Sequence, residues 1–446
     1  MTQMRPIRET IPLQEAREII DQATSPVARV ERVPLAHANR RVLAADVVSP
    51  MDVPPFARAA MDGYAVMAAD TFGAGQFDPK VLRVVETVYT GQVPARPIGA
   101  GECTEIATGA PLPPGADAVV MVEETEKAAD GQVRLFSPVY PAQNVGRRGA
   151  DIKTAQVVLR RGDLLTPSRV GAMAAIGLDE VDVFAKPRVA ILSTGNEVVA
   201  PGEPLPPGAI YDINKFTLTA IIVEHGGVAE PHRTPADALE DLGRALDEAA
   251  GADLIVFSGG SSVGERDLIL DALAQKGEVL FHGIAVKPGK PTLFGLLARP
   301  SAARRPESEV RSPESNGPRT SDSALRQAQG VVSLSNHGLR TPVLGMPGYP
   351  TSCLSNGYML LAPLLRRLAH LPPLEPRTVT VPLGQRVVST TGRHQFYTVR
   401  IVDGVAMPAF KASGDISSMS QADGYIEIPA QTDIVEKGQM VEVRLF

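Results

Sequence analysis

The spacing of apolar positions changes along the chain and divides it into regions with different secondary structure. Apolar residues recur every three or four positions over 13–23, between two prolines, and predict a helix. Short β-like runs such as 81–85 and 118–122 follow, separated by clusters of turn residues. Residues 51–149 are therefore predicted to form a strand-rich module.

From residue 186 onward, apolar runs of strand length alternate with helical patterns. This alternation predicts a mostly parallel sheet with helices on both of its faces. The predicted strands are 188–193, 253–258, 278–286, 292–297 and 342–345, and the predicted helices are 216–224, 234–250 with Thr234 as its N-cap, 265–275 and a long one after Pro350.

The remaining patterns complete a domain plan. A short helical run at 168–176 lies in a stretch that is expected to continue the N-terminal element, so that the strand-rich module is an insertion. After two prolines at 372–373, short alternating runs predict a small C-terminal β domain with strands at 378–381, 396–402, 425–428 and 441–445. The predicted fold class is multidomain α+β, with a central α/β domain, a β-rich inserted domain and a C-terminal β domain. The predicted domains are 1–50 with 150–185, 51–149, 186–373 and 374–446.

One stretch of the predicted α/β domain has no sustained period. Residues 299–341 are rich in Ser, Pro and Arg and carry seven Arg against four acidic residues. This composition favours a disordered surface insertion. Its basic bias is compatible with a docking arm as the alternative.

Composition excludes several classes of protein. The chain has 446 residues, a net charge of −6 and 4% aromatic residues without Trp, which argues against nucleic-acid binding. It has no apolar stretch of membrane-spanning length and no signal-peptide pattern, so a cytoplasmic protein without a membrane segment is expected. Two cysteines cannot form a disulfide framework, and no zinc-binding motif is present.

Four loops follow predicted strands, where ligands bind in α/β sheets. They are 193–197, 258–264, 287–291 and 347–352. The Gly- and Ser-rich 258–264 loop leads into a helix and offers backbone N–H groups to an anion, although an ordinary turn has the same composition. Lys287 and Lys290 flank a Pro-Gly turn and would present two positive charges to phosphate or another oxyanion. The alternative is a pair of solvated surface lysines. The candidate binding residues are Gly195, Ser258, Gly259, Gly260, Ser262, Gly264, Lys287, Lys290, Gly348 and Ser352.

Acidic residues stand beside these anion-binding loops. Glu197 and Asp267 would repel a bound phosphate unless a cation lay between them, and Mg²⁺ bound through carboxylates and substrate oxygens satisfies that condition. Asp267 is alternatively a favourable charge in the first turn of a helix. Asp62 and Asp151 each stand near glycine and, on composition alone, are more simply read as turn residues.

Strings distributed over nearly the whole chain match motifs of one family in order and approximate spacing. They are 60–65 (AMDGYA), 108–111 (TGAP), 115–120 (GADAVV), 148–152 (RGADI), 193–197 (STGNE), 258–260 (SGG), 262–264 (SVG) with Asp267, 287–291 (KPGKP), 347–348 (PG) with Pro350 and Ser352, and 413–424. In these strings the chain resembles the molybdopterin molybdenumtransferase family, the MoeA and gephyrin E-domain group.

The resemblance implies an architecture and a site. It implies four domains in an elongated homodimer, with a molybdopterin-binding α/β domain and an N-terminal linker or dimerisation domain. The active site would lie between the α/β domain and the N-terminal domains of the partner subunit. It would unite four catalytic acids, namely Asp62, Asp151, Glu197 and Asp267. Arg393 of the C-terminal domain would add a positive charge for the substrate.

The resemblance also implies a reaction. Adenylylated molybdopterin and molybdate are the substrates, the adenylyl group is hydrolysed with Mg²⁺ present, and AMP is released as metal binds the dithiolene sulfurs. A molybdopterin adenylyltransferase would act upstream and molybdoenzymes downstream. Tungstate in place of molybdate is one alternative, and a non-catalytic pterin-nucleotide binding or scaffold protein is another. Retention of the four acids and both lysines favours the enzyme.

Some positions depart from the family pattern. Tyr349 replaces Asn in the PGNP loop, Ala150 replaces Glu in GED, and Gly146 stands where Arg is common. Residues 234–235 read Thr-Pro where Asp-Asp is frequent, and Ser261 replaces Val in SGGVS. The chain is therefore expected to be a divergent member.

Overall fold

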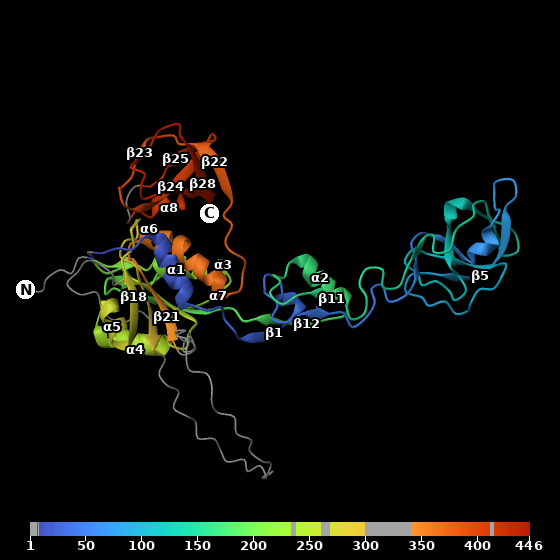
Figure 1. Cartoon of the computed structure of the whole chain (residues 1–446), viewed down its shortest axis with the longest axis horizontal. Coiled ribbons are helices and arrows are strands. Elements are labelled where there is room, and N and C mark those ends of the chain that lie inside the picture. Colours follow the sequence, from blue (N-terminus) through green and yellow to red (C-terminus); the bar gives the residue numbers. More distant parts are fainter. Residues whose placement is uncertain (1–6, 8, 233–237, 260–267, 299–339, 411–413) are drawn as a thin grey trace, which may run out of the picture. The chain divides into compact units, whose positions relative to one another are not determined.

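The computed structural model describes residues 7, 9–232, 238–259, 268–298, 340–410 and 414–446. Their contacts divide the chain into two compact units. The first unit comprises Met1–Arg29 and Ala185–Phe446, and the second comprises Val30–Phe184 (Figure 1). The predicted region 1–50 is therefore shared between the two units.

The first unit is built on a six-stranded sheet. Its strand order is β16-β13-β17-β21-β20-β18. β16, β13, β17 and β21 are parallel, whereas β20 and β18 are antiparallel to their neighbours. The mostly parallel sheet is thus confirmed. The strands are β13 (Arg188–Ser193), β16 (Val228–Pro231), β17 (Leu254–Ser258), β18 (Gly277–His282), β20 (Leu293–Ala298) and β21 (Arg340–Met346).

Helices cover both faces of this sheet, as predicted. Successive residues of a strand point to opposite faces, and Ile191 of β13 packs in one buried cluster while its neighbour Leu192 packs in another. Leu218 and Leu365 lie in the first cluster, and Leu246 lies in the second. The helices of the first face are α1 (Leu13–Ala23), α3 (Asn214–Glu224), α6 (Pro350–Asn356) and α7 (Ala362–Leu368), and those of the second are α4 (Leu239–Ala249) and α5 (Leu268–Lys276) (Figure 1).

Several predicted boundaries differ from the structure, three of them for a visible reason. The helix predicted over 234–250 begins at Leu239, because Ala238 has extended backbone; Thr234 lies outside the described residues. The strand predicted over 278–286 is two strands, β18 and the short β19 (Val286–Lys287), since the chain turns between them. The last two residues of the predicted insertion, 340 and 341, begin strand β21; the rest of that insertion lies outside the described residues.

A C-terminal β domain completes the first unit. Its sheet has the order β19-β24-β26-β28-β22, with β25 paired to β24. Strand β19 comes from the α/β region, so a backbone ladder joins the two regions. The other elements are β22 (Thr378–Pro382), β23 (Val387–Val388), β24 (His394–Val402), β25 (Val405–Pro408), α8 (Ser417–Ser420), β26 (Gly424–Ile428), β27 (Ile434–Val435) and β28 (Met440–Leu445).

The second unit has three clusters of buried hydrophobic residues among its described residues. Two of them pack on the six-stranded sheet of order β7-β4-β6-β5-β9-β8, one around Tyr64 and Leu135 and the other around Ala65 and Ile106. The third lies around Leu43 and Met173, where residues from both ends of the unit pack together. Its strands pair β1 with β12 and β2 with β11, which joins residues before the module to residues after it.

The elements of the second unit follow in chain order. They are β1 (Val30–Pro34), η1 (Leu35–His37), β2 (Val47–Val48), β3 (Arg58–Ala59), β4 (Gly63–Val66), η2 (Ala68–Thr71), β5 (Lys80–Val88), β6 (Glu102–Ile106), β7 (Ala118–Met121), η3 (Val122–Glu124), β8 (Thr125–Lys127), β9 (Gln132–Leu135), β10 (Val145–Gly146), β11 (Val157–Leu159), α2 (Pro167–Ala175) and β12 (Glu180–Phe184).

Candidate functional site

Three parallel strands of the first unit end side by side. Ser193 at the end of β13 is paired with Ser258 at the end of β17, which is paired with Met346 of β21. The Thr194 N–H donates to the Ser258 carbonyl at 3.0 Å, and the Gly259 N–H donates to the Met346 carbonyl at 3.2 Å. The loops that follow these strands therefore start at one edge of the sheet, as the sequence predicted.

Glycine lets these loops approach one another closely. Gly259 has φ +105°, and a Cβ there would lie 2.5 Å from the Thr194 carbonyl oxygen. A Cβ on Gly348 would lie 3.3 Å from the Gly259 Cα. Side chains at these two positions would push the loops apart, so glycine keeps their backbone groups together.

Several buried polar atoms at this edge have no hydrogen-bond partner in the described part of the chain. They include Ser193 Oγ, Thr194 Oγ1 and Asn214 Oδ1. Asn214 begins α3, and its Nδ2 donates to the Gly348 carbonyl at 2.7 Å, which fixes the orientation of the amide. Because an unpaired buried polar atom is costly, these atoms are suited to contact a ligand or water.

Sequence reasoning did not identify the polar residues before and at the start of α3. Asp212 is 7% exposed, and its carboxylate accepts from the Lys215 N–H at 3.0 Å. A cavity of about 90 Å³ lies beside it. The sequence did contain a signal for these residues, because Asp212 and Asn214 directly precede the helix predicted over 216–224. The cavity is lined by Val198, Val199, Ala200, Pro201, Asp212, Lys215 and Phe216.

The two predicted lysines are held in place by specific contacts. Lys287 Nζ donates to Thr390 Oγ1 of the C-terminal domain at 2.7 Å. Lys290 Nζ donates to the Ile7 carbonyl at 2.9 Å. Both contacts are partly buried, so the two side chains are not simply solvated.

Helix α6 supports the turn between these lysines. Ser355 Oγ donates to the Pro288 carbonyl, and Asn356 Nδ2 donates to the Gly289 carbonyl, both at 3.2 Å. Gly289 has φ +119°, and a Cβ there would lie 2.3 Å from Asn356 Oδ1. Ser352, another predicted binding residue, is 4% exposed in the first turn of the same helix. One helix therefore carries a candidate binding residue and fixes the lysine turn.

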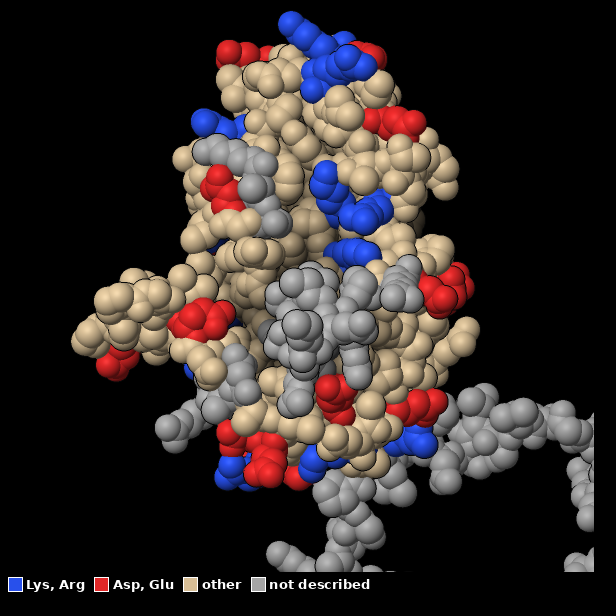
Figure 2. All heavy atoms as spheres, turned by 90° about the vertical axis from the view of Figure 1, so that its left-hand side faces the viewer, with Lys and Arg blue, Asp and Glu red and all other residues tan. Residues whose placement is uncertain are grey.

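Arg393 directly precedes β24, the strand that pairs with β19 and so joins the C-terminal domain to the lysine turn. Its neighbour His394 is paired with Val286, and Lys287 is paired with Gln395. The structure thus brings the backbone of Arg393 close to that of Lys287, although the two are far apart in sequence. The face of the first unit shown in Figure 2 carries Lys and Arg side chains near its centre.

The predicted acids lie in different environments. Glu197 is exposed, and its carbonyl accepts from the Ile210 N–H at 2.8 Å, which links β14 (Val198–Val199) to β15 (Ile210–Tyr211). A Cβ on Gly195 would lie 2.9 Å from the Glu197 carboxylate. Among the described residues, no group of three or more His, Cys, Asp or Glu could hold a metal ion. Four predicted residues, Gly260, Ser262, Gly264 and Asp267, lie outside the described residues.

The other two acids belong to the second unit. Asp62 accepts from the Thr108 N–H at 2.7 Å and from Thr108 Oγ1 at 2.9 Å, and these bonds lower the pKa of its carboxyl group. Asp151 is exposed and donates its N–H to the Val53 carbonyl at 3.0 Å. The approach of these acids to Glu197 is not a property of either unit alone and stays a prediction.

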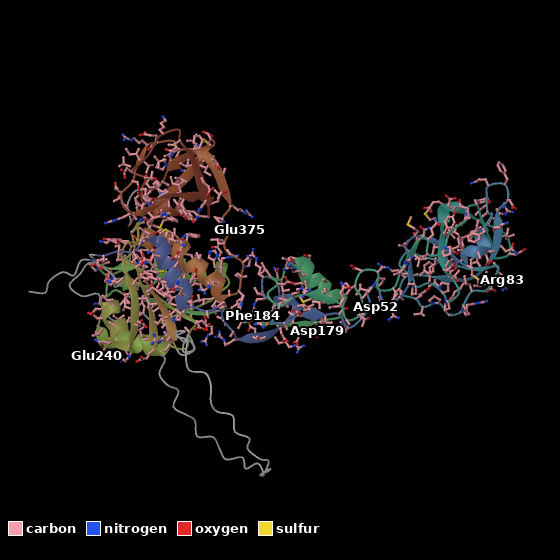
Figure 3. All side chains as sticks on the ribbon, viewed as in Figure 1. Asp52, Arg83, Asp179, Phe184, Glu240 and Glu375 are labelled. Atoms are coloured by element: carbon pink, nitrogen blue, oxygen red, sulfur yellow. The ribbon has the colours of Figure 1, made fainter. Side chains whose placement is uncertain are left out.

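A further acid of the second unit escaped the sequence analysis. Asp52 (Figure 3) accepts from Arg148 Nε at 2.7 Å and from the Thr154 N–H at 2.9 Å. The bonds from Thr154 and Arg148 lower its pKa. Asp52 therefore ties the start of the β-rich module to its end and to the segment after it, which contains Asp151.

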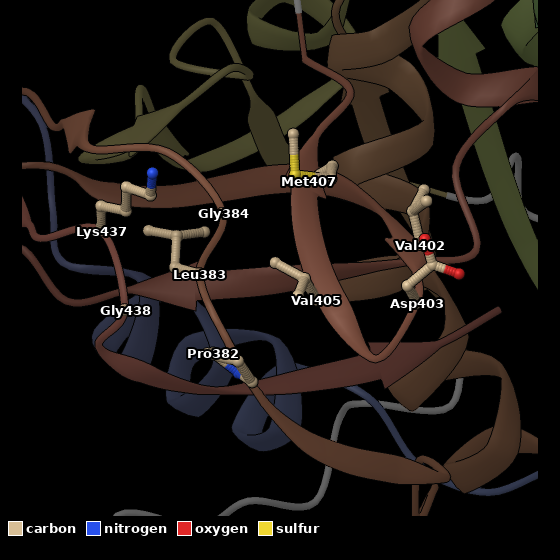
Figure 4. Close-up of a pocket in the computed structure, with 9 residues that line it drawn as sticks. All are labelled: Pro382, Leu383, Gly384, Val402, Asp403, Val405, Met407, Lys437 and Gly438. Carbon is tan, nitrogen blue, oxygen red and sulfur yellow. The ribbon is translucent and has the colours of Figure 1, made fainter.

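An apolar hollow of about 430 Å³ lies in the C-terminal domain. Figure 4 shows Lys437 and Asp403 on opposite sides of it, with apolar side chains between them. Its lining lacks the polar atoms without partners that mark the strand edge. It is lined by Pro382, Leu383, Gly384, Val402, Asp403, Val405, Met407, Lys437 and Gly438.

Three family models match successive parts of the chain. Residues 11–177 match the MoeA N-terminal region (domains I and II), 190–367 match a probable molybdopterin binding domain, and 380–446 match the MoeA C-terminal region (domain IV). In the described residues no helix is long and apolar enough to cross a membrane.

Relatives match the chain over most of its length. Molybdopterin molybdenumtransferase 2 of Mycobacterium tuberculosis is 32% identical over 92% of this chain and 94% of its own. The molybdopterin molybdenumtransferase of Haemophilus influenzae is 29% identical over 97% and 98%. The crystal structure of a molybdopterin biosynthesis MoeA protein from Pyrococcus horikosii has a TM-score of 0.79 and 36% identity, covering 98% of this chain and 99% of that one.

Proposed function

Since this chain belongs to the MoeA family, we propose that it is a molybdopterin molybdenumtransferase. It would take adenylylated molybdopterin and molybdate, insert the metal and release AMP. Relatives that carry this name match almost the whole chain, which supports the same activity here. The observation that carries the proposal is the pair of fixed lysines, Lys287 and Lys290.

The lysines supply what the substrates require. Molybdate is an oxyanion and the pterin nucleotide is a polyanion, and an ammonium group binds either as a compact point charge. Lys287 and Lys290 are held before any ligand arrives, so less of their side-chain entropy is lost on binding. Fixed donors also stabilise charge that develops as the phosphoanhydride is cleaved.

The polar strand edge is the proposed site for the organic part of the substrate. Asn214 Oδ1 can only accept a hydrogen bond, and a pterin offers N–H donors. The hydroxyl groups of Ser193 and Thr194 can donate or accept. The proposed contacts would satisfy buried atoms that have no partner in the described part of the chain.

A magnesium site is part of the proposal. Mg²⁺ prefers oxygen ligands and often takes only one or two protein carboxylates beside substrate phosphates. The exposed Glu197 carboxylate fits this requirement, and Asp267 would be the second ligand. When bound, the ion would neutralise charge on the phosphates. Asp62 and Asp151 would share with these acids the task of orienting the attacking water.

The proposal includes an assembly and a cellular context. We propose a cytoplasmic homodimer in which the N-terminal domains of the partner subunit complete the site with its copies of Asp62 and Asp151. The four-domain division, 1–50 with 150–185, 51–149, 186–373 and 374–446, is retained as part of this proposal. An upstream molybdopterin adenylyltransferase would supply the substrate, and downstream molybdoenzymes would take the product.

AMP release tests the proposal. Purified protein is given adenylylated molybdopterin and Mg²⁺ with molybdate, with tungstate or with neither oxyanion. AMP release that depends on an oxyanion is expected, and the two oxyanions then rank the metals. Tight binding of the nucleotide without AMP release under any condition would contradict the transferase and favour a binding protein.

A further inference from the structure

A tight turn of the C-terminal domain lies against Lys287. It runs from Thr390 to Arg393, and the Arg393 N–H donates to the Thr390 carbonyl at 3.3 Å. Gly392, at the third position, has φ +79°, which glycine adopts without strain. The turn therefore holds Thr390 and Arg393 at its two ends.

Contacts within the C-terminal domain fix this turn. Thr391 Oγ1 donates to Asp433 Oδ1 at 2.6 Å, and the Ser389 N–H donates to the Asp433 carbonyl at 2.7 Å. The Gly392 N–H donates to the Ala430 carbonyl at 2.9 Å. The position of Thr390 is thus set by its own domain and does not depend on Lys287.

The contact between Lys287 and Thr390 has a defined direction. An ammonium group has three donors and no acceptor, so Lys287 Nζ is the donor in the 2.7 Å bond and Thr390 Oγ1 the acceptor. The hydroxyl hydrogen of Thr390 then points away from Lys287. Donation from a cation polarises the hydroxyl and strengthens it as a donor. Thr390 is only half-buried, so a ligand can reach it.

We propose that Thr390 is an oxyanion-binding residue: its hydroxyl accepts from Lys287 and donates to the tetrahedral oxyanion that Lys287 attracts. The inference rests on the proposed function and adds a specific residue of the C-terminal domain to its site. It assigns the β19–β24 ladder a role, because this pairing keeps Lys287 beside the turn.

Molybdate binding to the full chain tests this residue directly. Calorimetric titration with sodium molybdate compares the wild-type protein with Thr390→Val, Thr390→Ser and Lys287→Gln. Thr390→Val keeps the shape but removes the hydroxyl, and about tenfold weaker binding is expected, the size of effect typical for one hydrogen bond to a charged group. Thr390→Ser restores the hydroxyl and should bind within about twofold of wild type, well under the effect of losing a hydrogen bond.

Thr391→Val is the matched control. It removes a hydroxyl from the same turn that bonds to Asp433 and not to Lys287. The backbone bonds from Ser389 and Gly392 still hold the turn, so molybdate binding should change little. A thermal melt of each variant establishes that it is folded.

The outcomes separate this inference from the proposed function. Loss of affinity in Thr390→Val with rescue by Thr390→Ser supports the inference. Wild-type affinity in Thr390→Val, while Lys287→Gln binds weakly, overturns the role of Thr390 and leaves the proposed function intact. An equal loss in Thr391→Val would mean that the turn acts only structurally and also overturns the inference. A wild-type protein that binds no molybdate contradicts both.

Discussion

The carboxylate of Asp62 accepts two hydrogen bonds from a single residue, Thr108. Together they hold the side chain in one orientation and lower its pKa, so that the group is ionised at neutral pH. From composition alone Asp62 is most simply a turn residue beside glycine. The contacts instead describe a positioned anion, which is what orientation of a water molecule or a cation requires.

Replacing Asp62 by Asn is expected to abolish AMP release and to leave binding of the pterin nucleotide almost unchanged. The amide keeps the size of the side chain but removes its charge, and Asp62 is not among the residues proposed to bind the nucleotide. Paired assays of AMP release and nucleotide binding check this expectation. Wild-type turnover in the variant would remove Asp62 from the proposed mechanism.

His225, at the end of α3, contrasts with Asp62. Asp62 is hydrogen-bonded and has a proposed role, whereas His225 is buried and has no role in the proposed site. Neither ring nitrogen has a hydrogen-bond partner in the described part of the chain, and the residue is 2% exposed. Burial lowers its pKa below the ordinary value of 6.5. The unfolded state therefore binds a proton at a higher pH than the folded state does.

This difference predicts an acid-sensitive stability. As pH falls below 6.5, the unfolded state is protonated first, and the free energy of unfolding decreases by up to about 1.4 kcal/mol per pH unit until the folded pKa is reached. His225→Leu should remove this contribution, so its melting temperature should fall less between pH 7 and pH 5. His37→Gln, at an exposed position, is the control. An unchanged pH dependence in His225→Leu would contradict the prediction.

At the scale of elements, helices with a clear period and strong end signals were predicted well. The helix at 13–23 matches α1 because its apolar spacing is regular and prolines lie near both ends. The long helix after Pro350 is present, but a π-helical turn, Gly357–Leu361, interrupts it. Arg17 Nε donates to the Met359 carbonyl in this turn at 3.1 Å. That donor comes from α1, so local sequence could not show the interruption.

The directions of β18 and β20 could not be predicted from the sequence. The pattern of β18 and β20 indicates burial and extended backbone, but the same pattern fits either direction. Their antiparallel pairing follows from the short connection between them, which reverses the chain and forms the lysine turn. The prediction of a mostly parallel sheet is therefore confirmed, and the structure adds which strands are the antiparallel ones.

The lysine turn gives a prediction at the scale of elements. In Gly289→Ala the new methyl group would occupy the place of Asn356 Oδ1, 2.3 Å from the built Cβ, on backbone with φ +119°. Overpacking and backbone strain should destabilise the protein by about 2 kcal/mol. The displaced turn should also weaken molybdate binding.

A second glycine provides the control for this variant. Gly251→Ala adds a methyl group that meets nothing within 4 Å, so stability and molybdate binding should stay close to wild type. Chemical denaturation and molybdate titration measure both effects. A Gly289→Ala protein as stable as wild type would contradict the role assigned to the Asn356 contact.

At the scale of the whole molecule, the central sheet shows where the segment 299–339 is inserted. Ala298 at the end of β20 is paired with Arg340 at the start of β21. The two ends of the segment are therefore neighbours in an antiparallel pair. Two-residue turns commonly join such pairs.

Replacing residues 299–339 by Asn-Gly should consequently give a folded protein. A shorter connection loses less conformational entropy when its two ends are brought together. The melting temperature should therefore equal or exceed that of wild type. Oxyanion-dependent AMP release should be retained, because the proposed site residues lie elsewhere in the chain. Loss of AMP release in a variant with a normal melt would show that the segment acts in the reaction and would contradict this prediction.

The sequence by itself determined the succession of elements, the mixed fold class and the loops at the strand ends, since all of these depend on local periodicity and turn chemistry. Its motifs also indicated the family. Tertiary structure alone decided that α1 packs on the central sheet, that β19 pairs with β24, and that Thr390, Asn356 and Ile7 hold the lysine turn. These contacts join residues tens to hundreds of positions apart, and their partners are selected by the geometry of packing, which a local pattern does not encode.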